Sequence, residues 1–343
     1  MKISFLVTYY NQEQYVRESM DSLLAVEKPE EWEILVGDDG STDRTREIVQ
    51  EYIRRDPEHI RLYVMPRENG HSYGSVLRAS ANRLNLLEHC GGDCFCILDG
   101  DDFYRDRQFA LEAIRILEEH ADVSVVMYGF QLYSEENGIK ECLLPEPLEG
   151  LIDTKEYLEH YYLHSGAGVH RLNWGKERMA FIRQAGFFDD NDIVINSLNE
   201  GSMYFVRRCI YAYRQTGASI FSEMSETERA VLNVQGYDVD RWLIPDQYWR
   251  VLLDRNAESV LHMFLNRRKI QDSLGVEKYS RYVRECEKIR DSLTYQLLRF
   301  RNLSGRDRRR IFRIIRRLCT DRPGMAARKM IAQIRKGNKE NRS

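Results

Sequence analysis

The sequence predicts an α/β protein with a mostly parallel sheet flanked by helices and a helical C-terminal extension. Over the first half of the chain, short apolar runs alternate with stretches of helical periodicity, which is the pattern of strand–helix–strand units. Several of these runs end abruptly at polar or acidic residues, as strands do where their carboxyl ends carry a ligand site. The 343 residues, 43% hydrophobic and 31% charged, are enough for one large domain or two smaller ones.

The expected elements follow one another with short connections. A strand at residues 2–8 is followed by a helix over residues 13–24, where Val16, Met20 and Leu23 fall on one face. Ser41 or Thr42 lies near the N-cap of a helix over residues 45–53. The other expected strands are 33–36, 61–64, 94–98, 123–128 and 202–206, and the other helices are 74–87 and 106–120. Residues 134–150, with two prolines and two glycines, form a loop between two lobes, and the pattern is helical beyond about residue 246.

The acidic run after the strand at residues 94–98 is the most informative feature. Asp99, Asp101 and Asp102 place three carboxylates within four residues, and like charges raise each other's pKa unless a cation neutralises them. Mg²⁺ and Mn²⁺ prefer carboxylate oxygens and are often shared with substrate phosphates, although a solvated acidic turn would also explain the run. Because parallel strands end at one edge of a sheet, the loops around Tyr10, Asp39 and Asp101 should converge on one crevice.

Two common nucleotide sites are excluded by their motifs. No G-x-G-x-x-G follows the first strand, and no G-x-x-x-x-G-K-[ST] occurs anywhere in the chain. A nucleotidyltransferase also uses carboxylate-bound Mg²⁺ on an α/β sheet, but it should carry a glycine-rich loop with Lys or Arg after the first strand. The segment Tyr9–Gln12 contains none of these residues.

Charge is distributed unequally along the chain. Residues 299–343 contain 16 Lys and Arg against three Asp and Glu, a net charge of +13, so residues 1–298 carry about −16. One helical stripe of this basic region consists of Ile311, Ile314, Ile315 and Leu318, and arginines fill the opposite face. Such a helix suits an anionic membrane surface, or it packs on the protein body with a solvated charged face. Nucleic acid is a poorer partner because the body is acidic and aromatic residues are sparse in the tail.

The cysteines and the hydropathy pattern predict a cytoplasmic protein. Seven scattered cysteines fit free thiols in a reducing compartment, and Cys94 and Cys96 fall in an apolar strand where thiols act as small hydrophobes. No run of about 18 uncharged apolar residues is present, and Met1–Val7 is too short for a signal peptide. With the basic tail, the expectation extends to peripheral attachment at the inner face of the membrane.

Three motifs in order resemble those of family-2 glycosyltransferases of the GT-A fold. They are Val7–Asn11, Val36–Asp43 and Leu98–Asp102, each at the end of an expected strand, and the resemblance covers roughly residues 1–220. It implies metal-dependent, inverting transfer of a sugar from a UDP- or dTDP-linked donor to a hydroxyl of a glycan or lipid-linked acceptor, as in polysaccharide or glycolipid assembly. It also implies a catalytic domain over residues 1–222, divided into a nucleotide-sugar half (1–130) and an acceptor half (131–222). A helical, basic region would then occupy residues 223–343.

The resemblance further implies roles for individual residues. Tyr10 would stack on the nucleotide base, and Asp39 would accept a hydrogen bond from the ring N–H of uracil or thymine. Asp99 would hold the ribose or the water shell of the metal, and Asp101 would ligate the Mn²⁺ or Mg²⁺ that bridges the phosphates. Asp102 would orient the metal or cap the next helix. The remaining nucleotide-sugar ligands would be Thr8, Asn11, Gly100 and Arg78, and Arg78 would otherwise be a solvated helix residue.

The catalytic base is less well defined. Inverting members of the family need a carboxylate to take the proton of the acceptor hydroxyl, and they usually supply it as the Asp of a Glu–Asp pair. The matching segment here contains no such pair, so Asp192 is the first candidate, Asp190 the second and Glu200 the third, unless all three are surface acids. Gln215 stands where many members carry a His that helps to bind metal or diphosphate.

Two aromatic residues before this segment are expected at the acceptor site. Trp174 and His170 would line it, because an aromatic face stacks well on the C–H surface of a sugar, and a core tryptophan is the alternative. If the base has been lost, the protein would be a scaffold that binds a nucleotide-sugar without turning it over.

Overall fold

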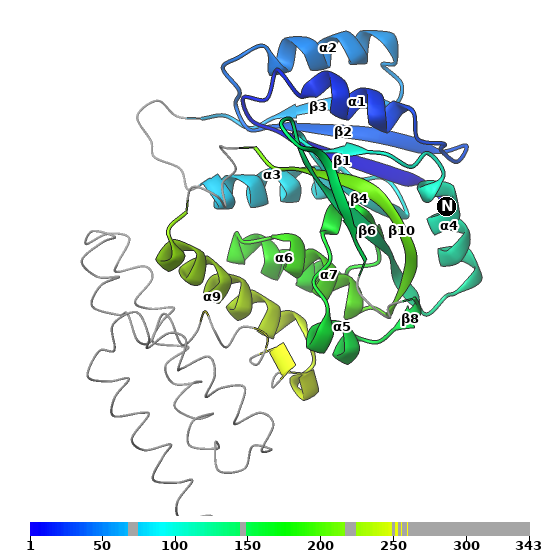
Figure 1. Cartoon of the computed structure of the whole chain (residues 1–343), viewed down its shortest axis with the longest axis vertical. Helices are drawn as coiled ribbons and strands as arrows, with labels where there is room; N and C mark the ends of the chain where they lie inside the picture. Colours follow the sequence, from blue (N-terminus) through cyan, green and yellow to red (C-terminus); the bar gives the residue numbers. More distant parts are fainter. Residues whose placement is uncertain are drawn as a thin grey trace, which may run out of the picture. The chain divides into compact units, whose positions relative to one another are not determined.

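The computed structural model describes residues 1–67, 75–144, 149–216 and 224–248, together with residues 251, 252, 255 and 259. The chain divides into two compact units, of which the first consists of Met1–Ser222 and Val239–Tyr248. A mixed sheet runs through this first unit, with its strands in the order β3-β2-β1-β4-β9-β6-β10-β5 (Figure 1). Strands β7 and β8 pair with β6 and β10, respectively.

The first half of this sheet is parallel and alternates with helices along the chain. Its elements are β1 (Ile3–Tyr9), α1 (Val16–Leu24), β2 (Trp32–Asp38), α2 (Thr45–Arg55), β3 (Ile60–Val64), α3 (Ser75–His89) and β4 (Cys94–Asp99). Strand β1 pairs in parallel with both β2 and β4, and β2 pairs in parallel with β3. Figure 1 shows α1 and α2 on one side of these strands and α3 on the other. The predicted fold class is therefore confirmed.

The apolar periodicity of the sequence explains these elements. Helix α1 buries Val16, Met20 and Leu23, which recur at the spacing of one helical turn. Strands β1 and β4 are buried along nearly their whole length, as expected for parallel strands that helices cover on both faces. The result is a buried layer whose carboxyl edge carries the three polar loops.

The second half of the sheet is mixed. Its elements are β5 (Phe103–Tyr104), α4 (Phe109–Glu119), β6 (Val123–Ser134), β7 (Gly138–Leu143), β8 (Gly150–Ile152), α5 (Thr154–His160), η1 (Ser165–Ala167), β9 (Gly168–Arg171), α6 (Lys176–Ala185), α7 (Asp190–Leu198) and β10 (Ser202–Arg214). Strands β6 and β10 are parallel, and β9 runs antiparallel to β4 and β6 between them. Both β6 and β10 are longer than predicted, because β7 pairs with the far half of β6 and the two long strands continue together.

Helix α9 (Glu226–Leu243) and the short η2 (Asp246–Tyr248) complete the described elements. The helices predicted beyond residue 246 and the basic region 299–343 fall almost entirely outside the described residues. Within the part of the chain that the structure describes, no helix combines the length and apolar character needed to cross a membrane.

Two cysteines depart from the expectation of free thiols. Cys142 on β7 and Cys209 on β10 form a disulfide across the intervening strand β6, with their Cα atoms 6.2 Å apart. Cys94 and Cys96 are free and buried in β4, as the sequence predicts. The disulfide therefore ties the hairpin of β6 and β7 to β10.

Candidate active site

The carboxyl ends of β1, β2 and β4 bring the three motifs together, as the sequence predicts. Thr8 is in register with Asp99 on the neighbouring strand, and its hydroxyl donates to the Asp99 carboxylate at 3.1 Å. The backbone N–H of Asn11 donates to Ser41 Oγ at 2.9 Å, and that of Thr42 donates to Asn11 Oδ1 at 2.8 Å. Ser41 thus joins two loops and does not cap α2, whose N-cap residue makes no side-chain hydrogen bond.

The second motif supplies a buried carboxylate between two arginines. Asp39 forms ion pairs with Arg67 and Arg78. The Arg67 guanidinium also lies 3.7 Å from the ring centroid of Tyr10, whose side chain is 42% exposed. Arg78 is held by Asp39 on the site side of α3, and it is not a solvated helix residue. Tyr10, Asp39 and Arg78 therefore lie side by side in one polar, aromatic corner.

The third motif turns sharply at the end of β4. A Cβ atom on Gly100 would lie 2.1 Å from Cδ1 of Tyr9, so only glycine lets the loop pass this ring. Burial, together with the nearby charge of Asp99, raises the pKa of Asp101 to about 6. The two carboxylates repel each other when both are ionised. Their oxygens are hard ligands, and a bound divalent cation would offset this repulsion.

Asp102 anchors the loop to β10. Its two oxygens accept hydrogen bonds from Tyr211 Oη at 2.6 Å and from the backbone N–H of Arg214 at 2.7 Å. Burial raises its pKa well above the ordinary value, and the charges of Asp101 and Asp99 add to the effect. The next helix, α4, begins at Phe109 with Gln108 as its N-cap residue, so the expected capping role of Asp102 is wrong.

Arg214 fixes the same loop from the other side. Its side chain is only 2% exposed, and its Nε donates to the backbone carbonyl of Asp101 at 2.7 Å. The guanidinium forms ion pairs with Glu18 and Glu135 and lies over the rings of Tyr15 and Tyr133. The acidic third motif is thereby held between β10, α1 and the end of β6.

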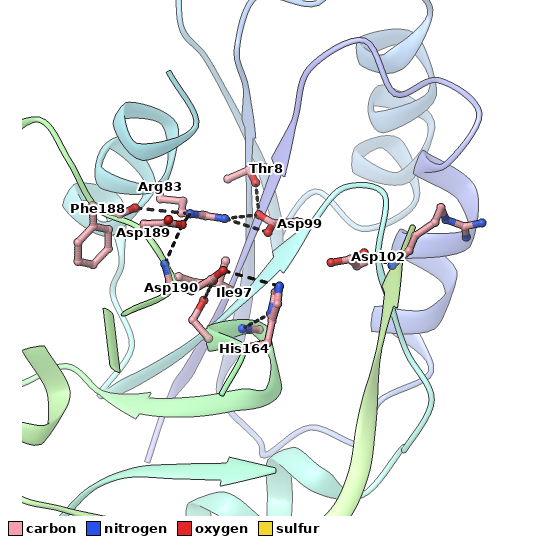
Figure 2. Close-up of polar contacts among 12 residues, drawn as sticks. Thr8, Arg83, Ile97, Asp99, Asp102, His164, Phe188, Asp189 and Asp190 are labelled. Carbon is pink, nitrogen blue, oxygen red and sulfur yellow. Dashed lines mark hydrogen bonds and ion pairs between the residues drawn. The ribbon is translucent and has the colours of Figure 1, made fainter. Parts of the chain in front are cut away.

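Arg83 on α3 joins the third motif to the segment expected to hold the base. Its Nη2 donates to both oxygens of Asp99 at 2.9 Å, and its Nη1 lies 3.5 Å from Asp189 Oδ1 (Figure 2). Burial alone would lower the pKa of Arg83, but the surrounding carboxylates of Asp99, Asp190 and Asp189 raise it. The arginine is therefore a fixed positive charge between two acidic segments that are far apart in the sequence.

The start of α7 gives the two principal base candidates opposite surroundings. Asp189 and Asp192 form a capping box, in which the backbone N–H of Asp189 donates to Asp192 Oδ2 at 2.8 Å. Asp192 is fully buried, and burial together with Asp240 raises its pKa well above the ordinary value. Its carboxyl group therefore points into the fold and stabilises the first turn of the helix.

Asp190 instead faces the third motif. Its carboxylate lies 3.9 Å from His164 Nε2 (Figure 2). It also accepts a hydrogen bond from Ser165 Oγ at 2.5 Å. Burial alone would raise the pKa of Asp190, but His164, Arg83 and the Ser165 hydroxyl together lower it. A carboxylate that stays ionised near Asp99 is chemically able to accept a proton.

The remaining predicted residues lie in other surroundings. Glu200 pairs with Arg178, and Trp174 makes edge contacts with Phe95 and Phe188 in the core. His170 is fully buried, with Nδ1 2.9 Å from Ser197 Oγ, and burial lowers its pKa to about 4. Burial of Trp174 matches the core role that the sequence left open for it.

One cluster of the described residues has the spacing of a metal site. Oxygen atoms of Asp99 and Asp102 and a ring nitrogen of His164 lie within 4.8 Å of one another. However, His164 Nδ1 accepts the backbone N–H of Gly166 at 3.1 Å, so the ring proton is on Nε2, which then has no lone pair for a metal. Both Asp102 oxygens are also engaged. The carboxylates of Asp99 and Asp101 therefore fit a divalent cation better than His164 does.

Arg83, His164 and Ser165 are not among the site residues that the sequence predicts. Arg83 falls within a predicted helix, where an arginine is usually solvated, and its role depends on a helix packing that the sequence does not contain. For His164 and Ser165, the only signal in the sequence is the change from apolar Leu163 to the run His164–Gly166.

Known proteins share both sequence and fold with this chain. Residues 4–171 match the family model described as glycosyl transferase family 2. The uncharacterized protein Rv1520 of Mycobacterium tuberculosis (strain ATCC 25618 / H37Rv) is 27% identical over 143 residues, which are 42% of this chain and 39% of the relative. The putative glycosyltransferase EpsE of Bacillus subtilis (strain 168) is 27% identical over 216 residues, which are 62% of this chain and 73% of the relative.

The fold is also found in a solved structure. The crystal structure of S. aureus TarS in complex with UDP-GlcNAc has a TM-score of 0.58 at 16% identity, covering 84% of this chain and 80% of that chain. The chain spans about two fifths of the length of the M. tuberculosis relative. The family match and the ordered motifs nevertheless agree, and residues 4–171 belong to glycosyl transferase family 2.

Proposed function

We propose that this protein is a metal-dependent, inverting glycosyltransferase. It would move a sugar from a UDP- or dTDP-linked donor to a hydroxyl group of a glycan or lipid-linked acceptor. The observation that carries the proposal is the link through Arg83, which places the Asp99 carboxylate and the start of α7 in one ion-paired network. Glycosyl transfer requires a site that binds the donor and a base that takes the proton of the acceptor hydroxyl, and this network would bring the two together.

The donor base is assigned to the corner formed by Tyr10, Asp39 and Arg78. Uracil and thymine carry a ring N–H between two carbonyl oxygens, which matches a carboxylate acceptor flanked by arginine donors at Asp39. Tyr10 has the exposed ring face on which a base can stack. The UDP-GlcNAc held by the TarS structure of the same fold supports a uridine nucleotide.

The metal is assigned to Asp101 with Asp99, next to Gly100, Thr8 and Asn11. Burial and repulsion from Asp99 raise the pKa of Asp101, and a bound cation would offset that repulsion. Bound Mn²⁺ or Mg²⁺ would neutralise the charge that develops on the leaving nucleoside diphosphate. Arg214 and Gly100 keep the loop in the shape that presents Asp101.

Asp190 is proposed as the base in preference to Asp192. Its oxygen would take the proton of the acceptor hydroxyl while the hydroxyl oxygen bonds to the anomeric carbon from the face opposite the leaving group. The bond from that carbon to the diphosphate oxygen breaks, so the configuration inverts. Asp192 is less suited because it is buried and its oxygen serves the capping box.

The test is release of UDP or dTDP from a panel of nucleotide-sugars by the full chain, with Mn²⁺, with Mg²⁺ and with chelator. Metal-dependent release from one donor is expected, and Asp101→Ala should abolish it. Nucleotide-sugar binding without any release, in the presence of candidate acceptors as well, would instead indicate a scaffold. Absence of both binding and release would overturn the assignment of the acidic loops.

The acceptor and the cellular setting are also part of the proposal. We infer from the sequence of residues 299–343 that the basic region attaches the protein to an anionic membrane surface at the cytoplasmic face. This location would give it access to a lipid-linked or growing glycan acceptor.

A further inference from the structure

His164 presents a fixed N–H group to the acids of the site. Its side chain is 6% exposed and its ring stacks on that of Tyr211, with the centroids 4.9 Å apart. Nδ1 accepts the backbone N–H of Gly166, which caps the short helix η1. Because a backbone amide always donates, Nδ1 is unprotonated and the ring proton is on Nε2. Among the described residues, this Nε2–H donates no hydrogen bond.

The distance between His164 and Asp190 is that of two groups bridged by one oxygen atom. Nε2 lies 3.9 Å from Asp190 Oδ2, which is too far for a direct hydrogen bond. An oxygen about 2.8 Å from both atoms would bridge this gap. The Ser165 hydroxyl donates to the other oxygen, Oδ1, and so orients the carboxylate while leaving Oδ2 for a further partner.

We propose that this partner is the acceptor hydroxyl and that His164 is a further catalytic residue. The inference rests on the proposed function, in which Asp190 is the base. Nε2–H donates to one lone pair of the hydroxyl oxygen, the hydroxyl proton passes to Asp190 Oδ2, and the second lone pair bonds to the anomeric carbon. His164 keeps its own proton throughout. Its contribution is to hold the nucleophile with its proton directed at the base.

Two substitutions separate this role from the cap of η1. In His164→Asn the amide oxygen can accept the Gly166 N–H, since Asn is a favoured N-cap residue, but the side chain is too short to replace Nε2–H. In His164→Gln the longer amide places an N–H near the position of Nε2 and gives up the cap. A purely structural role therefore predicts greater damage in His164→Gln, and the catalytic role predicts greater damage in His164→Asn.

The experiment measures hydrolysis of UDP-GlcNAc with Mn²⁺ by the full chain, with water as the smallest acceptor able to fill the gap. The turnover number of His164→Asn should fall about 100-fold, as when one preorganised donor is removed from an active site, and His164→Gln should retain more. The affinity for UDP-GlcNAc, measured by calorimetry, should stay within about twofold in both, because the acceptor lies outside that binding equilibrium. Any result in which His164→Asn is not the slower variant overturns the inference.

A second measurement does not depend on turnover. Nitrogen-15 NMR of the His164 ring should show a proton on Nε2 and none on Nδ1, and the opposite tautomer would overturn the inference. Failure of the proposed function is distinguishable, because wild type would then release no nucleoside diphosphate from any nucleotide-sugar of the donor panel. If this inference alone fails, His164→Asn will release UDP at the wild-type rate.

Discussion

At the scale of single residues, Asp190 and Asp192 show how two neighbouring acids acquire different chemistry. Asp190 is stabilised as a carboxylate by a hydroxyl and by positive charge, whereas burial raises the pKa of Asp192 and favours its neutral form. A protonated carboxyl group has nearly the shape and hydrogen-bonding capacity of an amide. We therefore expect Asp192→Asn to keep most of the wild-type turnover and Asp190→Asn to lose at least about 100-fold.

The measurement is UDP release at saturating donor, together with circular dichroism to show that both variants fold. Asp192→Asn serves as the matched control, because it makes the same chemical change two residues away on the same helix. If Asp192→Asn folds but is as inactive as Asp190→Asn, Asp192 would again be the first candidate for the catalytic base.

His170 gives a residue-scale prediction for the dependence of stability on pH. Burial lowers its pKa from 6.5 to about 4, so the folded protein holds the ring neutral while the unfolded chain protonates it near its ordinary pKa. The stability associated with the neutral ring is fully present above pH 6.5 and is lost as the pH falls from 6.5 to 4. Urea unfolding should show wild type losing more stability than His170→Gln between pH 7.5 and pH 5. Equal losses in the two proteins would contradict this burial.

Much of the acidic edge of the sheet could be predicted from single residues, because motif order alone placed Asp39, Asp99 and Asp101 at the ends of neighbouring parallel strands. The base was harder to assign. Whether an acid caps a helix or faces a site depends on its rotation about the helix axis. In the structure, the capping box of Asp189 and Asp192 fixes that rotation at the start of α7. The sequence pattern does not show which of the acids form this box.

At the scale of elements, strand β10 supports the acidic loop Asp99–Asp102 through one arginine, Arg214. Arg214→Met would leave the Asp101 carbonyl and two glutamates without their partner, so we expect a loss of about 2–3 kcal/mol in the free energy of unfolding. Affinity for Mn²⁺ should fall as well, since the loop that presents Asp101 would no longer be held. Denaturant unfolding and metal titration monitor the two effects separately.

Arg208 on the same strand is the matched control for this experiment. It also pairs with two acids, Asp106 and Glu112, but its side chain is 38% exposed and neither partner belongs to the acidic run Asp99–Asp102. Arg208→Met should therefore cost less than about 1 kcal/mol and leave Mn²⁺ affinity unchanged. Equal effects of the two substitutions would show that the loop does not depend on Arg214.

The elements of the first half were predictable because buried strands and amphipathic helices have distinct periodicities. The far halves of β6 and β10 were not, since their polar residues do not alternate and their strand conformation depends on pairing with β7 and with each other. The Cys142–Cys209 disulfide belongs to the same pairing and was equally inaccessible to a count of cysteines.

At the scale of the whole molecule, the charge split of the sequence predicts membrane attachment. The full chain should bind vesicles that contain phosphatidylglycerol and not vesicles of phosphatidylcholine alone, with binding weakened as salt rises above about 0.15 M. Replacing Arg308, Arg309 and Arg310 by Gln removes three of the 16 basic residues and should weaken sedimentation with vesicles. Salt-insensitive binding, or none, would indicate that the tail packs on protein instead.

The single guanidinium of Arg83 has a consequence for substrate binding. It pairs with both Asp99, which the proposed mechanism assigns to the donor, and Asp189, which lies beside the proposed base. A cation bound at Asp99 would weaken the first pair and so strengthen the pairing of Arg83 with Asp189. Thermodynamic linkage makes such a dependence reciprocal, so each substrate changes the affinity for the other by the same factor. We therefore expect the donor and the acceptor to bind together, and the dissociation constant of each, measured by calorimetry, to change by the same factor when the other is present.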